Sequence, residues 1–169
     1  LAPDFADPWF GLGVLALNTG NTDDSLIFFR KAVRLDDENP EIWYLLGKAH
    51  YSKGEKKAAL RCFREALKLD AYYDEVWIDL GKIILSDGLV SKALPYLTHA
   101  YKITGDIPGI NYLLASFYLQ TGSSEKAYRH LSLAITLDKD LFKDFEDIFP
   151  GKLFTRKIKK LLSENYLSD

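Results

Sequence analysis

Three tryptophans divide the first half of this 169-residue chain into equal intervals. Successive tryptophans are 34 residues apart, at Trp9, Trp43 and Trp77. One glycine follows each tryptophan after four residues and another after eleven, giving Gly13, Gly20, Gly47, Gly54, Gly81 and Gly88. A spacing kept to the residue over three copies predicts a repeat architecture in which each interval is one small supersecondary unit.

The second half of each interval repeats as well, and here a fourth copy is present. Two columns hold small residues, namely Ser25, Ala59, Ala93 and Ala127, and Ala32, Ala66, Ala100 and Ala134. A third column holds larger apolar residues, Phe29, Phe63, Leu97 and Leu131. In the fourth copy Asn111 replaces the tryptophan, whereas Gly122 keeps the later glycine. Small residues let two helix backbones approach closely, so these columns indicate paired helices.

The apolar residues of each interval recur at helical spacing in two stretches. In the second copy the first stretch contains Ile42, Leu45, Leu46 and Ala49, and the second contains Ala59, Leu60, Phe63, Ala66 and Leu67. Gly54 separates them, and glycine tolerates the left-handed backbone conformation that ends many helices. We therefore predict an all-α protein built from antiparallel helix pairs.

The stretch WYLLGKAHYSKGEKKAALRCFREALKL, which begins at Trp43, resembles the tetratricopeptide repeat (TPR) family. That family combines Trp-x-x-Leu-Gly with Ala-x-x-x-Phe-x-x-Ala on a 34-residue period. The resemblance extends over residues 1–138. It implies a right-handed superhelical solenoid with four repeats, at about 6–39, 40–73, 74–107 and 108–141. Leu1 and Pro3 match the end of a preceding repeat, so we expect residues 1–5 to be its tail and the chain to be the C-terminal part of a longer array.

Residues 139–169 leave the 34-residue register. Two apolar stretches, around Phe145 and around Ile158, flank the break at Pro150-Gly151 and predict two further helices. A solenoid needs a polar-backed element over its last apolar face, so we expect a degenerate capping helix pair. Five basic residues occupy positions 152–160, and they either face solvent on the cap or dock an acidic partner.

The sequence contains no pattern that predicts catalysis. It lacks a Gly-rich phosphate loop, a His-Glu-x-x-His motif and a Cys-x-x-Cys pair. His50 is expected in the core, and no third metal ligand accompanies His99 and His130. Cys62 is expected on the outer side of a second helix as a bystander thiol. We therefore predict no enzyme activity, no cofactor and no metal site.

Charge and composition exclude several partner classes. The net charge of −2 does not favour nucleic acid, and no apolar run is long enough to span a membrane. One cysteine cannot form an internal disulfide, which favours a reducing compartment. These features favour a cytoplasmic location and a protein partner.

The resemblance to TPR proteins implies that the first helices line a concave groove for a short segment of a partner protein. The expected groove residues stand one, five or eight positions after the tryptophan column, and they are Phe10, Val14, Tyr44, Lys48, Tyr51, Ile78, Lys82, Tyr112 and Ser116. Aromatic surfaces with a few polar anchors suit peptide recognition. The lysines favour an apolar ligand with at least one acidic group, unless Glu41, Glu75 and Asp79 neutralise them.

Two other roles are open. The chain is alternatively an architectural spacer or a self-association segment of a larger protein. Ile27 and Phe28 form an apolar pair where the next copy has Arg61 and Cys62. This pair predicts contact either with upstream repeats or with a second copy in a homodimer.

Overall fold

The computed structural model describes residues 5–86 and 90–166, which form helices and no β-strand. The α-helices of these residues are α1 (Ala6–Asn18), α2 (Thr22–Leu35), α3 (Pro40–Ser52), α4 (Lys56–Leu69), α5 (Asp74–Ser86), α6 (Val90–Thr104), α7 (Pro108–Gln120), α8 (Ser124–Leu137) and α9 (Arg156–Tyr166). Two 3₁₀ helices, η1 (Asp140–Ile148) and η2 (Gly151–Leu153), precede α9. The all-α prediction is confirmed.

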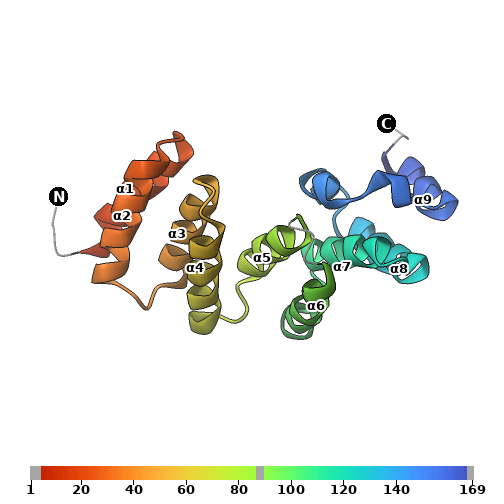
Figure 1. The fold of residues 1–169 in the computed structure, drawn as a ribbon, viewed down its shortest axis with the longest axis horizontal. Helices are drawn as coiled ribbons and strands as arrows, with labels where there is room; N and C mark the ends of the chain where they lie inside the picture. Colours follow the sequence, from red (N-terminus) through yellow and green to blue (C-terminus); the bar gives the residue numbers. More distant parts are fainter. Residues whose placement is uncertain (1–4, 87–89, 167–169) are drawn as a thin grey trace. The chain divides into compact units, whose positions relative to one another are not determined.

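The contacts divide the chain into two units, Leu1–Val76 and Trp77–Asp169, with the boundary inside α5. In the first unit α1 packs against α2, α3 packs against α4, and α2 contacts α3 (Figure 1). In the second unit α7 packs against α8 and contacts α6, while η1 lies on α7 and α9 lies on α8. Consecutive helices joined by short loops are therefore the building block of both units.

Local sequence signals explain where the helices begin and end. Asn39 caps α3, because its side-chain oxygen accepts a hydrogen bond from the backbone N–H of Glu41 at 3.0 Å. Glycines in the left-handed conformation follow the first helices α1, α3 and α7, with φ values of 78° at Gly20, 81° at Gly54 and 78° at Gly122. The predicted stop is thus confirmed in three copies, and the equivalent Gly88 lies outside the described residues.

The two helices of a repeat meet at a glycine of the first helix. A Cβ atom added to Gly47 would lie 2.6 Å from Cε1 of Phe63, and one added to Gly13 would lie 2.6 Å from Cδ1 of Phe29. Both phenylalanines are buried in full or nearly so, as are Ala32 and Ala66. The aromatic ring therefore fills the hollow that the missing side chain leaves, which explains the glycine and phenylalanine columns.

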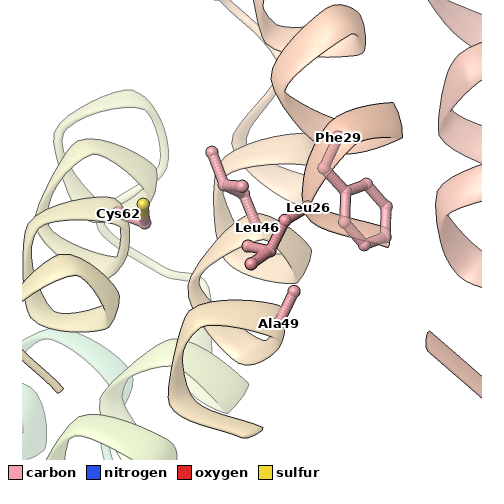
Figure 2. Packing of buried hydrophobic residues seen from close by; sticks show 5 residues of the cluster. All are labelled: Leu26, Phe29, Leu46, Ala49 and Cys62. Carbon is pink, nitrogen blue, oxygen red and sulfur yellow. The ribbon is translucent and has the colours of Figure 1, made fainter. Parts of the chain in front are cut away.

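A cluster of buried side chains joins the first two repeats (Figure 2). It contains Leu26 and Phe29 from α2, Leu46 and Ala49 from α3, and Cys62 from α4. The prediction that Cys62 faces outward is wrong, because its side chain is only 6% exposed. The hollow over Gly47 admits it, since a Cβ there would lie 3.2 Å from Cβ of Cys62.

The C-terminal part differs from the predicted helix pair in its first half. Residues 140–148 form a 3₁₀ helix, in which Phe142, Phe145 and Ile148 are buried at every third position. A 3₁₀ helix has three residues per turn, so this spacing places the three side chains on one side. In the second half, α9 contacts α8 and contains the buried Ile158. The basic residues of 152–160 are exposed, which agrees with both interpretations of them.

We expect Gly47→Ala to lower the free energy of unfolding by about 1–3 kcal/mol, because the new methyl group overlaps the buried Phe63 ring. Gly11→Ala is the matched control. Gly11 lies inside α1 with no atom within 4 Å of an added Cβ, so alanine there should stabilise the helix by about 0.5–1 kcal/mol. Urea denaturation measures both changes, and equal midpoints for the two variants would contradict the packing account.

Cys62 should react slowly with thiol reagents in the folded chain. Burial raises the pKa of its thiol from 9.0 to about 11, so the thiolate fraction near pH 8 falls on the order of 100-fold. Labelling with a disulfide reagent that releases a chromophore measures the rate, with the chain unfolded in guanidinium chloride as the reference. Equal rates in the folded and unfolded chains would show that Cys62 is accessible.

Candidate peptide-binding surfaces

The first unit presents an aromatic and basic stripe on α3, formed by Tyr44, Lys48 and Tyr51. The three residues are spaced by four and three positions, so they share one side of the helix. Tyr44 is 8% exposed, and its ring centroid lies 5.9 Å from that of Phe63 and 5.1 Å from that of Tyr73. Lys48 is exposed, with its Nζ 5.3 Å from the centroid of the Tyr44 ring. Tyr51 is 41% exposed, so the α3 stripe runs from a buried ring to an accessible one.

Phe10 and Val14 contribute an apolar surface from α1, which contacts α3. Both side chains are half-buried and pack against the cluster around Phe29. The ring centroids of Phe10 and Phe29 are 6.2 Å apart. Of the five groove residues predicted in this unit, Lys48 and Tyr51 are therefore accessible, whereas the other three also belong to the packing between helices.

Acidic residues surround Tyr73 at the edge of the α3 stripe. The pKa of Tyr73 is raised to about 12, first by burial and then by the carboxylates of Glu41, Glu75, Asp70 and Asp74. Negative charge disfavours the tyrosinate, which explains the direction of the shift. The stripe thus has an acidic edge beside Tyr44 and a cationic group at Lys48.

The equivalent surface of the second unit is covered by the chain itself. Tyr112 and Ser116, both on α7, are 0% exposed. The Tyr112 ring stacks on Phe145 with 5.3 Å between centroids, and its hydroxyl donates to the carbonyl oxygen of Asp138 at 2.7 Å. Ser116 Oγ donates to the carbonyl oxygen of Ile148 at 2.5 Å. The expectation that Tyr112 and Ser116 line an open groove is therefore wrong in this structure, because η1 occupies that side of α7.

Ile78 and Lys82 of α5 also take part in packing within the second unit. A Cβ added to Gly109 would lie 2.5 Å from Cδ1 of Ile78, so this half-buried isoleucine fills the space beside α7. Lys82 is half-buried, and its Nζ lies 4.1 Å from the centroid of the Phe145 ring. An ammonium group at this distance from a ring face is held by cation–π attraction.

Asn111 and His130 form a buried polar pair that the sequence analysis missed. Asn111 is 0% exposed, and its side-chain amide donates to the carbonyl oxygen of Ile107 at 3.1 Å. Its remaining oxygen lies 2.8 Å from Nδ1 of His130, so that nitrogen carries the proton. Burial lowers the pKa of His130 below 6.5. The signal in the sequence was an asparagine in the tryptophan column with a histidine in the Phe28 column of the same copy.

The other two histidines, His50 and His99, make hydrogen-bond and ring contacts within the fold. His50 is 6% exposed, as predicted for a core residue, and its Nδ1 lies 2.6 Å from Oε2 of Glu55. That hydrogen bond lowers the pKa of Glu55. The exposed His99 packs edge-on against Trp77 with 5.5 Å between ring centroids.

Among residues 5–86 and 90–166, no group of three or more His, Cys, Asp or Glu side chains is arranged to hold a metal ion. A search of the same residues finds no helix with the length and hydropathy needed to span a bilayer.

Comparison with known families identifies the repeat. Models described as "Tetratricopeptide repeat" match residues 40–73 and 108–141, and one described as "TPR repeat" matches residues 17–54. Together the matches cover more than half of the 169 residues, so the chain belongs to the tetratricopeptide repeat family. The tetratricopeptide repeats support a role as a scaffold for protein–protein interaction.

Solved structures share the fold. A crystal structure of MamA is 23% identical, with a TM-score of 0.72 over 84% of this chain and 83% of that chain. The structure titled "YrrB: a TPR protein with an unusual peptide-binding site" is 19% identical, with a TM-score of 0.69 over 99% and 89%. The Cut9–Hcn1 structure is 17% identical, with a TM-score of 0.77 over 98% of this chain but 34% of that chain. The comparison with curated proteins gave no match.

We expect the stability of the chain to fall with decreasing pH partly through His130. Because burial lowers its folded pKa below 6.5, the unfolded chain takes up this proton first as the pH decreases. The free energy of unfolding therefore decreases from about pH 6.5 down to the folded pKa. His130→Gln keeps a donor near Asn111 without titrating, so chemical denaturation of this variant should show a flatter pH dependence. His99→Gln at the exposed position is the control, and an unchanged slope in His130→Gln would contradict the expectation.

Proposed function

We propose that the chain binds a short segment of a partner protein on the first unit, along the α3 stripe. The observation that carries the proposal is the division of α3 into two sides. Ile42, Leu46 and Ala49 are buried in the core, whereas Lys48 and Tyr51 are exposed on the other side. Tyrosine offers a rigid ring with a polar tip, and such side chains commonly dominate the energetics of protein interfaces.

The ligand segment is proposed to be apolar with at least one acidic group. The half-buried Phe10 and Val14 and the exposed Tyr51 supply apolar contact area, and the ammonium group of Lys48 lies over the buried Tyr44 ring. A charged hydrogen bond between this group and a carboxylate contributes about 1.5–3 kcal/mol. Because Glu41 and Glu75 act on Tyr73, the acidic group should lie toward Tyr51, away from those carboxylates.

The site proposed at the α3 stripe is smaller than the groove that the sequence predicted. The sequence placed Lys48 and Lys82 together as anchors, but Lys82 lies over Phe145 in the second unit. The proposal for the first unit therefore depends on Lys48 alone. The structural relative YrrB, described as a TPR protein with an unusual peptide-binding site, supports peptide binding as a use of this fold.

Self-association through Ile27 and Phe28 is a second candidate, with one observation for it and two against it. Ile27 is 61% exposed, which favours a contact there, whereas Phe28 is half-buried against Trp9 with 6.1 Å between ring centroids. A surface recess of about 310 Å³ beside them is lined by Trp9, Ile27, Arg30, Lys31 and Arg34. A two-fold dimer would bring the same three cations of both copies together, so this surface suits an acidic partner better than a second copy.

Selection from a random peptide library on the immobilised chain tests the proposed site. We expect the enriched peptides to combine apolar residues with Asp or Glu. In calorimetric titrations with one such peptide, Lys48→Glu should weaken binding by about 1–3 kcal/mol, because it replaces an attractive charge with a repulsive one. Lys68→Glu is the matched control, since Lys68 is an exposed lysine of α4 that pairs with Glu65. Equal losses in the two variants, or a loss only in Lys68→Glu, would refute binding at the α3 stripe.

A further inference from the structure

Residues 138–149 lie on the second unit in the way that a bound peptide lies on a receptor. Two side chains of α7 hold the backbone of this segment near its ends, Tyr112 at the carbonyl of Asp138 and Ser116 at the carbonyl of Ile148. Gln120 Nε2 approaches the same carbonyl of Ile148 at 3.4 Å. Contacts from receptor side chains to a ligand backbone are independent of the ligand's side chains, so this face can hold segments of different sequence.

The side chains of the segment match the ligand chemistry that the groove residues predict. Phe142, Phe145, Ile148 and Phe149 are buried, while Asp144, Glu146 and Asp147 are exposed. Phe145 lies between two predicted groove residues, with its ring stacked on Tyr112 and beneath the ammonium group of Lys82. The segment is therefore apolar on the receptor side and net acidic on the solvent side, where Lys139 and Lys143 are exposed as well.

The conformation of the segment indicates that α7 imposes it. η1 continues for nine residues as a 3₁₀ helix, whereas runs longer than three or four residues are uncommon because the hydrogen-bond geometry is poor. Every third residue of η1 faces the receptor, namely Phe142, Phe145 and Ile148. A segment shaped by its contacts rather than by its own hydrogen bonds should open more readily than the α-helices beside it.

We propose that residues 138–149 are a built-in ligand that closes a second peptide-binding surface on α5 and α7. The ligand that displaces it is a partner segment with apolar side chains at positions i, i+3 and i+6 and acidic residues between them. This inference rests on the proposed function in one respect only, since both sites use the same columns of first-helix residues. An intramolecular ligand acts at an effective concentration in the millimolar range, so the closed chain binds such a partner weakly.

A labelled synthetic peptide of residues 138–150 is the probe, and fluorescence anisotropy with the full chain is the measurement. Phe145→Ala removes the ring between Tyr112 and Lys82 and so weakens the built-in ligand. We expect it to bind the probe at least about ten-fold more tightly than the wild-type chain, because the competing segment is released. Lys143→Ala, at an exposed position of η1, is the control and should bind as weakly as wild type. No binding to Phe145→Ala, or equal affinity for all three chains, overturns the proposal.

Two further measurements complete the test, and the first of them uses the wild-type chain and so does not depend on how a variant folds. Hydrogen exchange of the wild-type chain should show residues 140–149 exchanging faster than α7, and equal protection of both would identify a permanent cap and overturn the proposal. In the Phe145→Ala background, Lys82→Glu should lower probe affinity about ten-fold, whereas Lys48→Glu should leave it unchanged. The reverse pattern would place the probe on the first unit. If these results refute the built-in ligand, the proposal for the α3 stripe still stands. That site is tested separately, by library peptides whose binding depends on Lys48.

Discussion

The close approach of two helices at one glycine determines the geometry of each repeat in the first unit. At Gly47 the ring of Phe63 occupies the space of the absent side chain, and Phe29 does the same at Gly13. Fixing Gly47 toward α4 also fixes the rest of α3, because successive residues of an α-helix point about 100° apart. Lys48, the next residue, points about 100° away from Gly47 and is exposed. The packing of the core thus decides which residues of α3 remain available to a ligand.

The 34-residue period was sufficient to predict the helix pairs because the interactions that define them are local. The glycines Gly20, Gly54 and Gly122 end helices within their own copies, and the small columns pack within or between neighbouring copies. Cys62 was placed wrongly because the hollow over Gly47 admits two consecutive residues of α4, which a single apolar stripe does not reveal. The covered face of α7 was missed for another reason. Phe142, Phe145 and Ile148 fit the spacing of an α-helix as well as that of a 3₁₀ helix, and the contact with α7 that selects the second is not encoded in the period.

The fourth copy shows how a polar pair replaces an apolar one inside a repeat. In the first copy Trp9 packs on Phe28, and the equivalent positions of the fourth copy hold Asn111 and His130. A buried amide without partners would cost about 1–3 kcal/mol. Asn111 avoids that cost, because Ile107 accepts from its nitrogen and His130 donates to its oxygen. The exchange preserves the fold and introduces a histidine at a position where the other copies hold Phe28, Cys62 and Tyr96.

The same columns of the repeat are exposed in the first unit and buried in the second, and the chain's connectivity explains the difference. Lys48 and Tyr51 are exposed on α3, whereas Ser116 and Leu119 at the equivalent positions of α7 are buried. The segment that covers α7 follows α8 directly, and its carbonyl at Asp138 already bonds to Tyr112 before η1 begins. A face apolar enough to bind phenylalanine-rich segments is also a site of unspecific association when it is exposed. Covering it with a segment of matching chemistry removes that hazard and leaves the face accessible to a ligand that competes successfully.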